Sequence, residues 1–362
     1  MSVTQPQSVA DAGTPLLNGG QIIAAHDAVV RGRVLLVTGL GLAACLAFLA
    51  DAAIGPSSLT LRQILQEIVS PGSLSRPLGV IVWDVRLAYA TMAVLSGAAL
   101  AIAGTEMQTV LNNALASPFT LGVSSAAALG AALAIVLGVA LPLVPQNWIV
   151  PANAFLFSAL AILAVQVLSR LTGEGAETLV LLGIAMMFAC NAGVALLQFV
   201  ASTQALQQLV FWMLGGLTRA DWGKIGLLAA VLTATLPFSL RAARPMNALR
   251  LGEDRARTFG VDVDRLRAFF LLRVSLLTGT AVAFVGTIAF VGLVAPHLAR
   301  LIVGEDHRFY LPASALAGAL LMSIASVASK LVVPGIVVPV GIVTSLIGVP
   351  AFLILIMSAR RR

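Results

Sequence analysis

The chain has 362 residues, of which 59% are hydrophobic and only 10% are charged, and its mean hydropathy is +1.00. A soluble domain of this length could not bury so much apolar surface in one core. Charge-free stretches at 34–49, 121–144 and 225–237 are typical of helices that cross a bilayer. We therefore expect an all-α, polytopic membrane protein.

The formal net charge of +7 would suggest a nucleic-acid partner in a soluble protein, but in a membrane protein it indicates orientation. With the amino terminus inside, most basic residues fall on the cytoplasmic side, so we expect both termini there and no nucleic-acid partner. These residues are Arg31, Arg33, Arg170, eight arginines from Arg241 to Arg273, Arg300, Arg308 and Arg360 to Arg362.

Residues 1–30 are polar, and we expect them to form an irregular cytoplasmic tail and not a cleaved signal peptide. Residues 31–362 are expected to form one transmembrane domain, with the first span starting after Arg33. Cys45 and Cys190 fall within expected spans and are interpreted as packing residues.

Apolar windows of about 20 residues predict ten spanning helices. Their positions are near 34–50, 87–108, 121–141, 152–170, 178–201, 225–240, 266–285, 288–303, 310–333 and 339–358. Small residues recur every fourth position in the third helix (Gly122, Ala126, Gly130, Ala134, Gly138) and in the second (Gly97, Ala101, Thr105), which favours close helix packing. Pro296 in the eighth helix should be surrounded by protein. Proline has no N–H, so the carbonyl one turn earlier in the helix must find another partner.

The long connection at 241–267 contains the segment LGEDRARTFG at 251–260. Gly252 can cap a short helix, Glu253 and Asp254 suit its first turn, and Gly260 can adopt a left-handed stop. Ala256 and Phe259 would then present an apolar edge for a cytoplasmic partner. The alternative is a basic loop that rests on anionic lipid.

Several blocks in sequence order carry a family resemblance. They read SGAALAIAG at 96–104, LASPFTLGVSS at 115–125, the segment at 251–260, FVGLVAPH at 290–297 and PVGIVT at 339–344. From about residue 34 to 358 the chain resembles the iron-chelate and cobalamin uptake permeases, the ten-helix transmembrane subunits of type II ABC importers.

The resemblance implies a homodimer, two copies of a separate ATPase that binds ATP and Mg²⁺, and a periplasmic or lipid-anchored solute-binding protein. This chain itself is expected to be no enzyme and to hold no cofactor or metal, and neither of its lysines, Lys224 and Lys330, fits a phosphate-binding loop.

The resemblance also assigns roles to individual residues. Coupling to the ATPase would use Leu251, Gly252, Glu253, Asp254, Arg255, Ala256, Arg257, Phe259 and Gly260. Asn113 and Leu115 match the cytoplasmic gate, although the usual proline is Ala114 here. The alternative there is an ordinary turn in which Asn112 or Asn113 satisfies helix-end groups.

On the outer side, Arg86 and Lys330 match cations that dock the solute-binding protein, whereas Tyr89 replaces a family arginine. Both cations could instead anchor the chain at lipid headgroups.

Glu106 is the acid expected inside a span, where it could line the substrate path or bond to nearby polar groups at the membrane edge. His297 and His307 flank Arg300 but lack a third ligand, so local hydrogen bonding is the better interpretation.

An inner-membrane permease for a ferric siderophore is the favoured function. Within the resembled family, haem, cobalamin or molybdate are alternative cargoes. Ser326 and Val337, where the family often has acids, are further departures, so the sequence assigns no particular cargo. The alternative class is an ion-gradient-driven transporter, but it would need ionisable groups at mid-membrane, and Glu106 alone is thin support. A membrane enzyme would need a nucleophile–base pair or a metal cluster among the spans, and the sequence offers neither.

Overall fold

The structure is a computed structural model, and it describes residues 19–359 apart from 56, 58, 173 and 174. Within these residues the secondary structure is helical, and the only strand-like feature is an isolated bridge between Val333 and Ile336. The all-α prediction is therefore confirmed.

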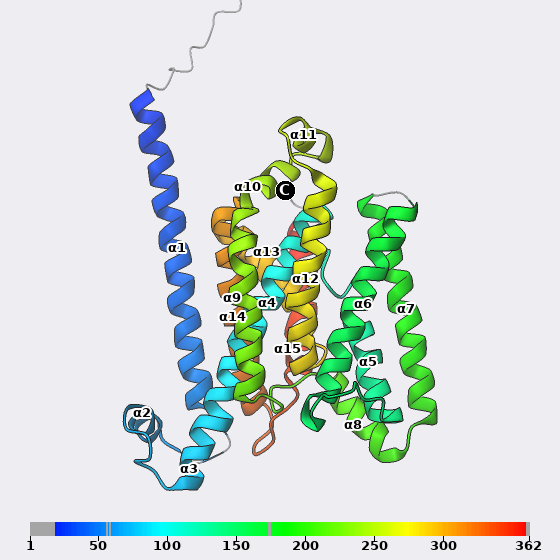
Figure 1. The fold of residues 1–362 in the computed structure, drawn as a ribbon. Helices are drawn as coiled ribbons and strands as arrows, with labels where there is room; N and C mark the ends of the chain where they lie inside the picture. The colour runs from blue at the N-terminus through cyan, green and yellow to red at the C-terminus, as the bar shows by residue number, and fades with distance from the viewer. Residues whose placement is uncertain (1–18, 56, 58, 173–174, 360–362) are drawn as a thin grey trace, which may run out of the picture.

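Each of the ten expected spans corresponds to a helix of the bundle in Figure 1. The helices are α1 (Gly19–Ala53), α4 (Ala88–Val110), α5 (Val123–Leu137), α6 (Ile149–Thr172), α7 (Ala176–Val200), α9 (Trp222–Arg241), α12 (Val263–Val285), α13 (Val291–Val303), α14 (His307–Leu331) and α15 (Val340–Ala359). Seven helical stretches are long and apolar enough to cross a membrane, and α5, α13 and α15 supply shorter apolar helices.

Short helices lie at the two ends of the bundle. One end carries α2 (Leu61–Val69), α3 (Arg76–Val80) and α8 (Thr203–Met213), and the other carries α10 (Ala243–Leu249) and α11 (Glu253–Thr258). We call these the α8 end and the α11 end. α1 begins and α15 ends at the α11 end, as an even number of crossings requires (Figure 1).

Two helix boundaries differ from the sequence prediction. α1 begins at Gly19, well before Arg31, because residues 19–30 contain good helix formers and no proline. α5 spans only Val123–Leu137, since Gly122 (φ +74°) and Gly138 (φ +67°) adopt left-handed conformations at its two ends. The predicted stripe is therefore reduced to Ala126, Gly130 and Ala134, all of them buried.

The centre of the bundle is formed by α4, α12 and α14, and small residues let their backbones approach closely. A side chain at Gly97 would overlap the carbonyl of Gly318 on α14, and one at Gly104 would overlap that of Gly292 on α13. The predicted close packing of the second helix is confirmed. Pro296 is buried, as expected for a proline in a spanning helix.

Candidate functional site

The segment 251–260 forms the short helix that its sequence predicts. Gly252 has φ +105° and precedes α11, and Gly260 has φ +80° and follows it. Both values lie where only glycine is unstrained. Glu253 and Asp254 occupy the first turn, and Arg255 and Arg257 the last, as the helix dipole favours. The local fold is confirmed, and the coupling role stays a prediction.

The predicted apolar edge of α11 requires one correction. Ala256 is fully buried and packs into the main core, so it holds α11 to the bundle and offers no surface to a partner. Phe259 is 68% exposed, and Leu251, which precedes the helix, is 54% exposed. The exposed apolar pair of this segment is therefore Leu251 and Phe259.

Ion pairs fix α11 to the start of α12. Glu253 accepts a 2.5 Å hydrogen bond from Arg267, whose side chain is almost fully buried. Arg257 lies 3.2 Å from both carboxylate oxygens of Asp264. Glu253 and Arg257 thus bind the start of α12, whereas Phe259 stays exposed.

The predicted gate residues lie in the loop after α4. Oδ1 of Asn113 accepts a hydrogen bond from the backbone N–H of Leu115 at 2.9 Å, which forms an Asx turn. Asn112 adopts a left-handed φ of +43°, and Leu115 is half exposed. The Asn113 side chain therefore orders the loop itself, although the proline at position 114 is absent.

A buried polar network joins the end of α4 to α10 and α14. The ring of His307 lies 2.7 Å from Oγ1 of Thr109 and 2.7 Å from Oδ1 of Asn247. The predicted hydrogen-bonding role of His307 is confirmed. Asp306 precedes it, and hydrogen bonds from Arg308 and Asn247 hold the pKa of this carboxyl well below its ordinary value.

Glu106 lies on α4 with no accessible surface in the protomer. Its carboxylate oxygens accept hydrogen bonds of 3.0 and 3.2 Å from Nε of Arg273 on α12. The sequence analysis counted Arg273 among the cytoplasmic charges and missed this pair. No local signal in 266–285 could identify the pair, because it depends on which helices become neighbours.

The two predicted docking cations are both engaged within the protomer. Lys330, with a 4% exposed side chain, lies 2.7 Å from Oδ1 of Asp51 on α1. Arg86 is buried and donates hydrogen bonds to the carbonyls of Ala53 and Ser57. Docking stays a prediction, but each cation now has a structural role that attaches the end of α1 to the bundle.

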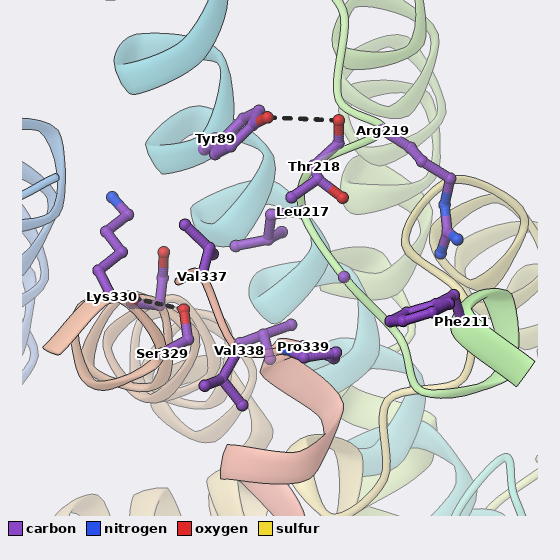
Figure 2. A pocket seen from close by; sticks show the side chains of 13 residues that line it. Tyr89, Phe211, Leu217, Thr218, Arg219, Ser329, Lys330, Val337, Val338 and Pro339 are labelled. Carbon is purple, nitrogen blue, oxygen red and sulfur yellow. Dashed lines mark hydrogen bonds between the residues drawn. The ribbon is translucent and has the colours of Figure 1, made fainter. Parts of the chain in front are cut away.

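A cavity of about 250 Å³ opens at the α8 end, between the starts of α4 and α15 and the end of α14. We call it the outer cavity; Figure 2 shows its lining. Three of the positions where the sequence departs from the resembled family, Tyr89, Ser326 and Val337, line it. Its lining contains two cations, Arg219 and Lys330, and no acidic residue.

Arg219 is the residue at this cavity that the sequence analysis passed over. Its position in the loop between α8 and α9 gave no periodic pattern from which burial could be read. Burial lowers the pKa of its guanidinium to about 10, so it remains charged at neutral pH.

The chain is similar in sequence to a family of transport proteins. Residues 42–358 match the model of the FecCD transport family. An ABC transporter permease of Methanocaldococcus jannaschii is 36% identical over 92% of this chain and 96% of the relative. The hemin transport permease HmuU of Yersinia pestis is 36% identical over 78% of this chain and 84% of the relative. The vitamin B12 import permease BtuC of Escherichia coli is 36% identical over 82% of this chain and 90% of the relative.

A solved structure of a metal-chelate type ABC transporter in an inward-facing conformation has the same fold. It aligns with a TM-score of 0.78 and 28% identity, covering 89% of this chain and 98% of that one. The chain belongs to the FecCD transport family and is the permease subunit of a type II ABC importer.

Proposed function

We propose that this chain forms the translocation pathway for an iron chelate, in the first place a ferric siderophore, across the inner membrane. The observation that carries the proposal is the outer cavity, which is lined by apolar and small polar side chains with two cations and no acid. Such a lining suits a bulky chelate that arrives with its metal already wrapped. A bare cation would need oxygen ligands.

Similarity supports the same class of cargo. The solved neighbour is titled a metal-chelate type transporter, and relatives carry haem or vitamin B12. Haem and vitamin B12 are the next candidates, because HmuU and BtuC are equally identical to this chain. An ion-gradient mechanism gains no support from Glu106, whose charge is matched by Arg273 inside the bundle.

The proposal places the α11 end in the cytoplasm and the α8 end outside, with both termini in the cytoplasm. Arginines are concentrated around α10, α11 and the start of α12, as the positive-inside rule requires. The active unit is a homodimer in the membrane lipid with two ATPase subunits at the α11 end. A solute-binding protein docks at the α8 end.

On the cytoplasmic side, the ATPase contact is formed by Leu251 and Phe259 together with the open face of α11. Exposed aromatic anchors of this kind dominate many protein interfaces. Glu253 pairs with Arg267, so a charge reversal at Glu253 would disturb α11 itself. Phe259→Ala is the cleaner probe.

The test is reconstitution of the chain in vesicles with its candidate ATPase and solute-binding protein. Uptake of ⁵⁵Fe-labelled siderophore is then measured with and without ATP. We expect ATP-dependent uptake, and at least about tenfold loss of stimulated ATP hydrolysis in Phe259→Ala. Phe238→Ala, an exposed aromatic on α9, is the matched control and should behave as the parent. Uptake driven by an ion gradient without ATPase would overturn the proposal.

A further inference from the structure

Arg219 is a partly buried cation whose printed hydrogen bonds go only to backbone carbonyls. One guanidinium nitrogen donates to the carbonyl of Val285 at 3.2 Å and lies 3.5 Å from that of Trp212. Its Nε is buried without a partner. A guanidinium offers five N–H donors, so most of them remain available.

The neighbouring lysines differ, because each of them has a carboxylate partner. Lys330 pairs with Asp51, and Lys224 lies 2.7 Å from Asp221. No carboxylate lies within ion-pair distance of Arg219 in the part of the chain that the structure describes. Asp221, two residues away, is bonded to Lys224 instead. A partly buried charge without a counter-ion is stabilised when a ligand supplies one.

The surroundings of Arg219 provide room for such a ligand. Its side chain lines the outer cavity and also a second cavity of about 320 Å³ whose polar lining includes Gln146, Asn147, Gln208 and Lys224. In Figure 2 the side chain runs toward Phe211 and away from Tyr89 and Lys330. The ring of Trp212 lies 5.8 Å from its guanidinium carbon, which favours a fixed orientation.

We propose that Arg219 recognises a carboxylate group of the cargo, so that this permease accepts an anionic, carboxylate-bearing iron chelate. The proposal deepens the function given above and rests on it. A planar guanidinium binds a carboxylate through two parallel hydrogen bonds, which a lysine cannot reproduce. An alternative partner is an acidic side chain of the solute-binding protein. The position of Arg219 in the lining of two cavities favours a small molecule.

The experiment measures direct binding to the full-length chain in nanodiscs of neutral lipid. The probes are ferric citrate, which carries carboxylates, and ferrichrome, a neutral hydroxamate chelate, both labelled with ⁵⁵Fe. Arg219→Gln removes the charge, and Arg219→Lys keeps it without the planar fork. Arg76→Gln removes an exposed cation from the same end of the molecule and serves as the matched control.

We expect Arg219→Gln to weaken ferric citrate binding by about tenfold or more and Arg219→Lys to lose only part of it. Ferrichrome binding should stay the same in all variants, and Arg76→Gln should match the parent with both probes. Thermal unfolding of each variant shows whether loss of the Val285 contact has disturbed the fold. Arg219→Lys is compared if Arg219→Gln does not fold.

Several results would overturn the inference: ferric citrate not binding the parent, binding within twofold of the parent in Arg219→Gln, or equal weakening of ferrichrome. A loss confined to solute-binding-protein affinity would assign Arg219 to docking and overturn it as well. The proposed function fails separately, if the complete reconstituted transporter moves no iron chelate with ATP.

Discussion

Glu106 on α4 and Arg273 on α12 form an ion pair inside the bundle, with Nε of Arg273 3.0 Å from Oε1 of Glu106. The carboxylate has no accessible surface, and the arginine side chain is 10% exposed. The guanidinium also lies over the ring of Phe270, 4.5 Å from its centroid. Two of the most buried helices are thus joined by a charged contact with little exposed surface.

Removal of either partner should destabilise the protein strongly, because it leaves an unpaired charge inside the bundle. We expect Glu106→Ala and Arg273→Ala each to cost about 3 to 5 kcal/mol. The double variant Glu106→Met with Arg273→Met should recover most of that loss. Thermal unfolding in nanodiscs measures all four proteins. Single variants as stable as the parent would show that the pair is not a buried contact in the membrane.

The approach of α4 to α14 depends on Gly97. We expect Gly97→Ala to lower stability by about 1 to 3 kcal/mol or to prevent folding, because the new methyl group overlaps the Gly318 carbonyl. Gly226→Ala on α9 is the control, since its added methyl group meets no atom within 4 Å. That variant should be neutral or slightly more stable. Equal unfolding temperatures for both variants would contradict the close packing.

Lys330 should have a structural role that can be separated from docking. Lys330→Met leaves Asp51 buried and unpaired, so we expect lower thermal stability and looser attachment of α1. Asp51→Asn combined with Lys330→Met should restore stability without restoring a cation. If affinity for the solute-binding protein also recovers in the double variant, Lys330 acts through α1. If affinity stays low while stability returns, direct docking is supported.

Glu67 gives a pH-dependent contribution to stability at the α8 end. Hydrogen bonds from the backbone N–H groups of Gly72 and Leu74 hold the pKa of its carboxyl below the ordinary value. This stabilisation is therefore full above the unfolded-state pKa and is lost as the pH falls through the lower, folded-state pKa. Glu67→Gln should be less stable than the parent at pH 7, and the difference should shrink on acidification. Parallel unfolding curves down to pH 3 would argue against it.

The sequence predicted the helices well, because membrane spans leave a strong signal in composition and length. It also predicted α11, since Gly252, Glu253 and Gly260 follow the rules of helix ends. What it missed were contacts between distant segments. Glu106 with Arg273, Lys330 with Asp51 and the burial of Ala256 depend on which helices become neighbours, and no local pattern encodes that.

The positions of the α12 arginines have a mechanical consequence. Arg267 binds Glu253 of α11, and Arg273 binds Glu106 of α4, six residues further along the same rigid helix. At 1.5 Å per residue, the two attachment points are separated by about 9 Å along the axis. A displacement of α11 would therefore be transmitted through the backbone of α12 to α4. The end of α4 leads directly into the loop of Asn113. The two ion pairs therefore connect α11 to α4 through helix alone, with no loop between them.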